Sequence, residues 1–332
     1  MAGRVLITGA TGAVGPSIVQ AFLKEDFSVR TFSIDPPERG MFPDVVENRI
    51  GDITSRSDID SAAKEVDCVV HMAALLHKEH LPRSLDPKYD LINVQGTSNI
   101  IRACLKENVR RLVFFSTSAV YGPGQGQIFS EDDLQHPDTE YARTKLAAEG
   151  LVLGAKVSSG QALGTVLRMS AVYGTRVKGN YRRLVRGLAR RRFLAVGKGE
   201  NRRTLIYDHD AASAAVLAAV HSAAAGRIFN VTDGRIYSLA EILRTLAQLL
   251  GRRPPRILVP SGVALIAAGA IELGGKMTGR LLPLSRKTIT RYLEDLPVSS
   301  KRISSELGFV PQFDMIRGWS EVIDEMRRTG EI

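Results

Sequence analysis

The sequence has few cysteines and no long apolar run, and each scarcity excludes a class of protein. Cys68 and Cys104 are its two cysteines, so neither a disulfide framework nor a CxxC metal site is available. No spacing of histidines with carboxylates indicates a metal, and none is expected. The start of the chain lacks a secretion signal, which together with the scarce cysteine favours a cytoplasmic location.

No apolar stretch reaches the length of a membrane span. The nearest one, residues 262–271, ends at Glu272. We expect it to be a core or lid helix, with a helix lying on a membrane surface as the alternative. Internal repeats and low-complexity segments are also missing.

The net charge is +10, and much of it comes from clustered arginines. Six of them, Arg182, Arg183, Arg186, Arg190, Arg191 and Arg192, precede Arg202 and Arg203. No recognition motif accompanies the cluster, and few aromatic residues interleave with it, so we expect no nucleic-acid partner. The cluster is either a solvated helix face or part of a pocket for an anionic substrate, since arginine binds phosphate in a bidentate way.

The segment 7–15, ITGATGAVG, is the most informative part of the chain. A short strand pattern at 4–7 precedes it, and a helical apolar pattern at 18–23 follows it. Glycines in this context let the backbone turn tightly and approach a pyrophosphate at a helix N-terminus. The spacing is GxxGxxG, and it predicts a dinucleotide-binding site.

Strand and helix patterns alternate over the first half of the chain. Expected strands lie at 4–7, 27–33, 67–71, 111–116 and 164–168, and expected helices at 15–25, 57–65, 88–107 and 139–158. This alternation predicts an α/β fold, a Rossmann-type doubly wound parallel sheet with a smaller C-terminal substrate-binding lobe. We assign 1–173 to the cofactor domain, with 204–232 returning to it, and 174–203 and 233–332 to the lobe.

A tyrosine and a lysine stand four residues apart within the expected helix 139–158. Tyr141 and Lys145 therefore share one helix face, and a nearby cation lowers the pKa of a phenol. Such a phenol can act as a general acid or base. Hydroxyl side chains follow the strand 111–116 and could bind the reacting oxygen, or else satisfy the backbone of the loop.

Together these segments resemble the extended short-chain dehydrogenase/reductase superfamily, in its NAD(P)-dependent nucleotide-sugar epimerase/dehydratase family. The resemblance is carried by 8–15, 51–53, 71–74, 93–97, 116–122, 141–145, 167–174, 203–210 and 229–231. It runs in order along nearly the whole chain. It is specific for the fold and the cofactor, and less so for the substrate.

The resemblance implies roles for individual residues. Catalysis would rest on Thr117, Tyr141 and Lys145. Cofactor contacts would come from Gly9, Thr11, Gly12, Ala13, Val14, Gly15, Ser33, Asp52, Ile53, Ala73, Ala74, Asn93, Ser116, Tyr141 and Lys145. Substrate contacts would come from Thr117, Ser118, Asn180 and Arg203, with Arg168 as a weaker candidate. The helices 88–107 and 139–158 would pair two copies into a homodimer.

Two departures from the family pattern bear on cofactor and substrate. Ser33 stands where an acidic residue would bind the adenosine 2′-hydroxyl, and Arg39 follows it, so the cofactor is either NAD or NADP. The segment 285–295 resembles hydroxysteroid-dehydrogenase-like and sugar-reductase relatives about as well as epimerases.

The residues after Thr117 narrow the reaction. Ser118 and Ala119 carry no carboxylate, which disfavours the dehydratases and decarboxylases of the family. The leading hypothesis is a UDP-hexose or UDP-N-acetylhexosamine 4-epimerase that uses transient hydride transfer. The alternatives are an NADPH-dependent 4-keto sugar-nucleotide reductase, a hydroxysteroid-type dehydrogenase, and a non-enzymatic NADP-sensing protein on the same fold.

Overall fold

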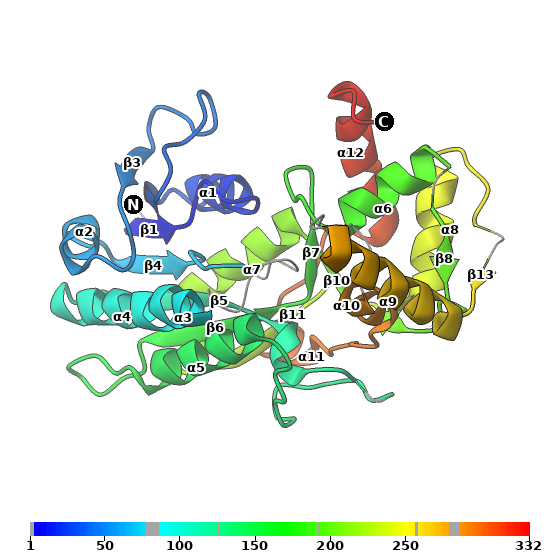
Figure 1. Cartoon of the computed structure of the whole chain (residues 1–332). Helices are drawn as coiled ribbons and strands as arrows, with labels where there is room; N and C mark the ends of the chain where they lie inside the picture. Colours follow the sequence, from blue (N-terminus) through cyan, green and yellow to red (C-terminus); the bar gives the residue numbers. More distant parts are fainter. Residues whose placement is uncertain (1–2, 77–85, 125, 192, 256–257, 279–285) are drawn as a thin grey trace.

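The computed structural model describes residues 3–76, 86–124, 126–191, 193–255, 258–278 and 286–332. Its centre is a seven-stranded sheet in the order β11-β6-β5-β4-β1-β2-β3, and all neighbours run parallel (Figure 1). The strands are β1 (Arg4–Thr8), β2 (Ser28–Ser33), β3 (Glu47–Ile50), β4 (Cys68–His71), β5 (Arg111–Thr117), β6 (Gly164–Met169) and β11 (Ile228–Val231). The doubly wound fold is confirmed.

Helices cover both faces of this sheet. On one face lie α1 (Gly15–Lys24) and α7 (Asp208–Val220); on the other lie α2 (Arg56–Ala62), α4 (Gly96–Lys106) and α5 (Glu140–Gly154). Strand β1 shows why: Val5 and Ile7 belong to the first core, while Leu6 belongs to the second. A strand that is buried on both sides is apolar throughout, as parallel sheets require.

The expected helix 88–107 is interrupted. A helical turn α3 (Asp86–Tyr89) leads into a π-helical turn, Asp90–Gln95, before α4 begins at Gly96. Turns of this kind often occur at functional sites. Strand β3 has no counterpart among the expected strands, because its residues alternate little and lie exposed at the edge of the sheet.

The smaller lobe contains α6 (Asn180–Ala189), α8 (Leu239–Leu249), α9 (Ser261–Thr278), α10 (Arg286–Leu293) and α12 (Met315–Arg328). Three short strand pairs lie between these helices in the sequence. They are β7 (Ala171–Tyr173) with β10 (Leu205–Tyr207), β9 (Arg202–Arg203) with β12 (Tyr237–Ser238), and β8 (Ala195–Val196) with β13 (Leu258–Val259). Trp319 and Tyr173 stack within its core. Arg192, expected in the basic helix, lies outside the described residues.

The C-terminal segment also reaches back to the sheet. Helix α11 (Lys301–Leu307) contributes Ile303 and Leu307 to the core beneath β11. Among the described helices, none is long and apolar enough to cross a membrane.

Candidate active site

The glycine turn after β1 is packed too closely for side chains. Gly9 has φ +72°, and a Cβ there would lie 2.8 Å from the backbone of Ala73. A Cβ on Gly15 would lie 1.8 Å from the carbonyl oxygen of Ala10. Two backbone hydrogen bonds hold the turn. The N–H of Gly12 donates to the carbonyl of Gly9 (3.0 Å), and the N–H of Gly15 donates to the carbonyl of Gly12 (3.2 Å). Glycine at these positions therefore lets α1 begin directly beneath the turn.

The first turn of α1 offers donors to an anion. Val14, the N-cap residue, makes no side-chain capping bond, and Pro16 stands in the first turn without an N–H of its own. The remaining N–H groups and the positive end of the helix dipole suit a pyrophosphate. With Thr11 and Ala13 in the same turn, these residues fit a dinucleotide.

At the end of β2, the hydroxyl of Ser33 is hydrogen-bonded to the glycine turn. The Oγ of Ser33 accepts a hydrogen bond from the amide of Thr11 at 3.2 Å, and Ser33 is buried. Asp35 and Arg39 are exposed just beyond it. A neutral group thus stands at the point where a carboxylate would repel a 2′-phosphate.

The loop after β3 is fixed by its own side chains. A carboxylate oxygen of Asp52 accepts the amide of Thr54 at 2.8 Å, and the Asn99 side chain donates to the carbonyl of Ile53 at 3.0 Å. Ile53 packs against Gly96, where a Cβ would lie 2.7 Å from its Cδ1. The loop is therefore rigid at the edge where the adenine contacts were expected.

A buried histidine joins the end of β1 to the start of α4. Thr97 donates its hydroxyl to the carbonyl of Asn93 at 2.6 Å, so Nε2 of His71 must donate to Thr97 (3.0 Å). Nδ1 of His71 then accepts from the hydroxyl of Thr8 at 2.7 Å. Burial lowers the pKa of His71 to about 3, and the Lys145 charge adds to this shift. The ring is neutral, in its Nε2–H form.

Asn93 holds the loop that follows β4. Its Oδ1 accepts the amide of Leu75 at 2.7 Å, and its Nδ2 donates to the Leu75 carbonyl (3.2 Å) and to Oγ1 of Thr144 (3.0 Å). Earlier in the loop, the amide of Ala73 donates to Oγ1 of Thr8 at 3.3 Å. Ala73 and Ala74 are thereby fixed between the glycine turn and α5.

Tyr141 and Lys145 lie one turn apart near the start of α5, whose N-terminus is capped by Thr139. Burial raises the pKa of Tyr141 to about 12. Burial also lowers the pKa of Lys145 to about 7, against the attraction of Glu149. The Lys145 ammonium lies 3.9 Å from the centre of the Phe114 ring. The expected lowering of the phenol pKa by the lysine is therefore not seen, because burial dominates both shifts and favours the neutral form of each group.

The hydroxyl groups that end β5 have different surroundings. Oγ1 of Thr117 accepts the amide of Ala119 at 3.2 Å, and its side chain is half-buried. Ser118 is buried in the turn that follows. Ser116 donates its hydroxyl to Glu149 of α5. The hydroxyl of Thr117 can therefore still donate a hydrogen bond to another acceptor, whereas the hydroxyl of Ser116 already donates to Glu149.

The residue that sequence reasoning missed is Glu149. It accepts three hydrogen bonds from Arg168 at 2.7–3.1 Å, and both side chains are 2% exposed. Arg168 also donates to the hydroxyl of Tyr121 at 2.9 Å, which in turn donates to Oδ1 of Asn230 at 2.8 Å. Arg168, expected as a weak substrate contact, is instead fully buried and paired. The spacing of four residues from Lys145 to Glu149 was the available signal.

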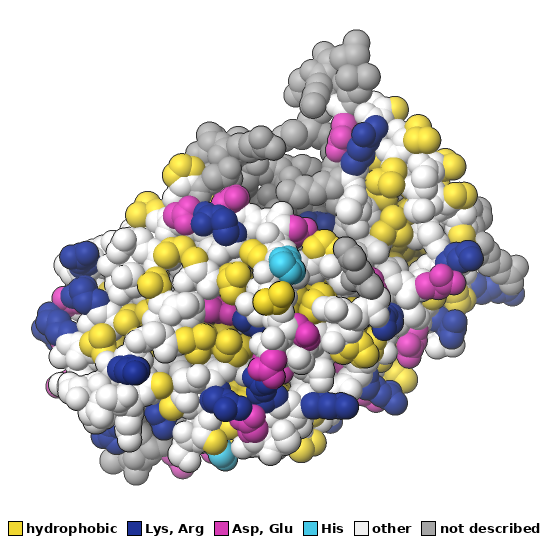
Figure 2. Space-filling view, turned by 90° about the horizontal axis from the view of Figure 1, so that it is seen from below, with side chains coloured by type: hydrophobic (Ala, Val, Ile, Leu, Met, Phe, Trp, Pro, Cys, Tyr) yellow, Lys and Arg dark blue, Asp and Glu magenta, His cyan; other side chains and the backbone are white. Residues whose placement is uncertain are grey.

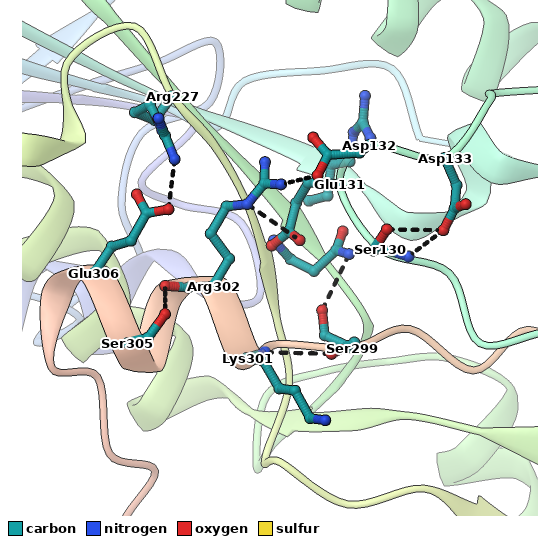
Figure 3. Close-up of polar contacts among 12 residues, drawn as sticks. Ser130, Glu131, Asp132, Asp133, Arg227, Ser299, Lys301, Arg302, Ser305 and Glu306 are labelled. Carbon is teal, nitrogen blue, oxygen red and sulfur yellow. Dashed lines mark hydrogen bonds and ion pairs between the residues drawn. The ribbon is translucent and has the colours of Figure 1, made fainter.

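The same polar chain continues to the surface (Figure 3). The amide of Asn230 donates to Glu131 at 2.8 Å, and Arg302 of α11 pairs with Glu131 and with the neighbouring Asp132. Burial raises the pKa of Glu131. These contacts tie the segment after β5 to β11 and α11.

Two expected substrate residues line one pocket in the smaller lobe. Asn180 and Arg203 face a cavity of about 550 Å³ that Tyr181, Tyr292 and Trp319 also line. Arg203 donates to the carbonyls of Arg291 (2.5 Å) and Tyr292 (3.1 Å). Thr117, Ser118 and Tyr141 are not among the residues that line it.

Two side-chain N–H donors at this pocket are buried without a hydrogen bond among the described residues. They are Nε of Arg203 and Nε1 of Trp319. A buried polar atom without a hydrogen bond costs about 1–3 kcal/mol. Groups of this kind at a pocket indicate a polar ligand that would complete them.

Comparison with known proteins identifies the class. The model of the NAD dependent epimerase/dehydratase family matches residues 5–232. The UDP-glucose 4-epimerase of Vibrio cholerae is 30% identical over 97% of this chain and 94% of its own. The chain is therefore an extended short-chain dehydrogenase/reductase enzyme and belongs to the NAD-dependent epimerase/dehydratase family.

Two further comparisons describe what the fold and sequence are similar to. An N-acetyl-α-D-glucosaminyl-diphospho-undecaprenol 4-epimerase of Escherichia coli O157:H7 is 25% identical over 96% of this chain and 93% of its own. The solved structure of MoeE5 with UDP-glucose and NAD is 26% identical, with a TM-score of 0.77 and coverage of 98% of this chain and 99% of that one.

Proposed function

We propose that this enzyme is a 4-epimerase of diphosphate-linked sugars, with a UDP-hexose or UDP-N-acetylhexosamine as its substrate. The pocket around Arg203 carries the proposal, because its unpaired buried donors suit the phosphates and base of a nucleotide. The 4-epimerases among its relatives act, by their names, on a UDP-sugar and on a sugar diphosphate held by a lipid. A sugar diphosphate is common to both.

In the proposed epimerisation, the residues of the chain have the following roles. NAD held by the glycine turn would supply reversible hydride transfer to and from the sugar. The phenol of Tyr141 exchanges the proton of the reacting hydroxyl, and Thr117 donates a hydrogen bond to the same oxygen. Lys145, beside Tyr141 on α5, would hold the nicotinamide ribose and, when protonated, would stabilise the phenolate. The glycine turn and α1 bind the pyrophosphate.

The loop after β5 favours epimerisation over elimination. Elimination of water needs an acid beside Thr117, and Ser118 and Ala119 offer no carboxylate. The buried carboxylate of α5, Glu149, is paired with Arg168 and Ser116, so it is not available to a substrate. Reversible oxidation at C4 remains.

A second candidate, an NADPH-dependent 4-keto sugar-nucleotide reductase, is favoured by the end of β2. Ser33 is neutral there, and the exposed Arg39 could pair with a 2′-phosphate. The Tyr141, Lys145 and Thr117 roles would be unchanged. The two candidates differ in whether the cofactor leaves after each turnover.

We also propose a cytoplasmic homodimer. Helices α4 and α5 pack side by side, and Leu105 and Leu151 on them are 39% and 40% exposed. A second copy could bury these leucines. Native mass spectrometry tests the dimer.

The experiment is incubation of the purified protein, with no cofactor added, with a panel of UDP-hexoses and their N-acetyl forms. Formation of C4 epimers supports an epimerase that retains its own NAD. Turnover that occurs only with a 4-keto sugar nucleotide and added NADPH supports the reductase. The absence of product in both assays refutes the epimerase and the reductase alike. The Tyr141→Phe protein is the control for background conversion.

A further inference from the structure

Helix α9 presents an apolar face to solvent. Val263 is 56% exposed and Ile266 is 73% exposed, and Ala267 and Ala270 on the same side are also exposed. These positions recur every three or four residues, which is the spacing of one helix face. The opposite side buries Ala264 and Ala268 against Val196 and Ile289. The helix is therefore held by one face and leaves the other without a partner among the described residues.

The strands before this helix extend the same apolar surface. Leu258 of β13 is 51% exposed, and Leu194, just before β8, is 61% exposed. Parallel pairing sets Leu258 beside Ala195, the residue that follows Leu194 in the chain. We call Leu194, Leu258, Val263 and Ile266 the α9 surface. Figure 2 shows hydrophobic side chains exposed on the smaller lobe, at the right of the view.

The segments that lead into β8 and into α9 are basic, and Glu272 lies within α9 just beyond them. Residues 182–198 and 251–271 contain no aspartate or glutamate. Their exposed cations include Arg183, Arg190, Arg191, Lys198, Arg252 and Arg253. Arg190 and Arg252 line one hollow together with Arg327 and Glu331, which shows that the two segments meet in space.

Most of these cations have no counter-charge. Among the described residues, Arg191, Lys198, Arg252 and Arg253 make no ion pair, although the protein forms many such pairs elsewhere. The α9 surface exposes apolar area to water, and these cations lie in the chain segments that lead into its strands and helix. This combination favours a partner that removes the apolar area from water and supplies negative charge.

We propose that the α9 surface docks on an anionic lipid bilayer. The helix would lie in the plane of the interface, with Val263 and Ile266 among the acyl chains and the arginines against lipid phosphates. A second copy of the chain fits less well. A two-fold contact would bring together two copies that each carry a net charge of +10, and it would not supply the excess negative charge that the cations favour. This docking is independent of the reaction proposed above.

The test is co-sedimentation of the full-length protein with vesicles of phosphatidylcholine, with and without phosphatidylglycerol. We expect binding to the anionic vesicles, release at high salt, and at least ~tenfold weaker binding to phosphatidylcholine alone. Ile266→Asp with Val263→Asp should abolish it. Val310→Asp is the matched control, because Val310 is 67% exposed but lies on the loop beside α7, away from α9.

Arg252→Glu with Arg253→Glu provides a second test that leaves the apolar face intact, and it should weaken binding to anionic vesicles by at least ~tenfold. The proposal is overturned if the unaltered protein ignores anionic vesicles, or if the α9 variants bind them as well as the Val310→Asp control does. It is equally overturned if the α9 variants change the native mass while vesicle binding stays the same, since a second copy would then cover this face.

Discussion

The buried pair of Glu149 and Arg168 offers the sharpest test of the site's architecture. Arg168→Leu would leave the Glu149 carboxylate without three of its hydrogen bonds, in a place where each side chain is 2% exposed. Removing one partner of a buried ion pair costs about 3–5 kcal/mol, because the other charge stays buried without compensation. The hydroxyl of Tyr121 loses a donor as well.

The assay is urea unfolding followed by far-UV circular dichroism at pH 7. We expect Arg168→Leu to lower the free energy of unfolding by about 3–5 kcal/mol. The Glu149→Leu, Arg168→Leu double variant should recover much of that loss, since neither charge of the pair is then left buried without its partner. Asp324→Asn is the matched control: it breaks an exposed pair with Arg327 at 3.1 Å and should cost less than ~1 kcal/mol. A loss for Arg168→Leu no larger than that of the control would refute the reasoning.

Three further predictions follow from the cofactor domain. Because the pKa of His71 is about 3 when folded and 6.5 when unfolded, the unfolded chain binds an extra proton between these values. The free energy of unfolding should therefore fall by up to ~1.4 kcal/mol for each pH unit below 6.5; urea titrations across this range should show a shallower dependence in His71→Gln. Gly15→Ala should abolish NAD binding in calorimetry or prevent folding, whereas Gly150→Ala, whose Cβ would meet nothing within 4 Å, should fold and bind NAD normally. Tyr141→Phe should slow epimerisation by about 10²–10⁴-fold while retaining NAD, measured by product formation and by absorbance of released cofactor.

The parallel sheet was predictable from the sequence because its physics is local. Val5, Leu6 and Ile7 form an apolar run that suits a strand buried on both faces, and the glycines after it permit one kind of turn. Strand β3 was not predictable in this way. Its segment Glu47–Ile50 is polar and lies at the edge, so it takes its place from pairing with β2 rather than from burial.

The candidate site was predictable where one element carries the signal. Tyr141 and Lys145 share a helix face by spacing alone. The Glu149–Arg168 pair joins α5 to β6, and nothing local to either element shows that Arg168 points inward to a carboxylate. The π-helical turn around Asn93 was hidden for a similar reason, because its side chain is oriented by Leu75 and by Thr144 of another helix.

The charge state of the Tyr141–Lys145 pair leads to a last prediction. Burial sets the pKa of the Tyr141 phenol at about 12 and that of Lys145 at about 7. Without a bound cofactor, Tyr141 therefore keeps its proton throughout the neutral pH range. A phenol in this state cannot accept a proton from a sugar hydroxyl at pH 7–9. An added positive charge close to Tyr141 would stabilise its phenolate, and bound oxidised NAD carries such a charge on its nicotinamide ring.

We therefore expect the tyrosinate absorbance of Tyr141 at pH 9 to appear only when oxidised NAD is bound. The measurement is the ultraviolet difference spectrum between the unaltered protein and Tyr141→Phe, each with and without NAD, so that the other tyrosines cancel. Reduced NAD, which lacks the ring charge, is the matched control and should leave the phenol protonated. Equal tyrosinate signals with the two forms would show that Lys145 alone sets the phenol's charge, and that burial does not dominate the pair as the structure indicates.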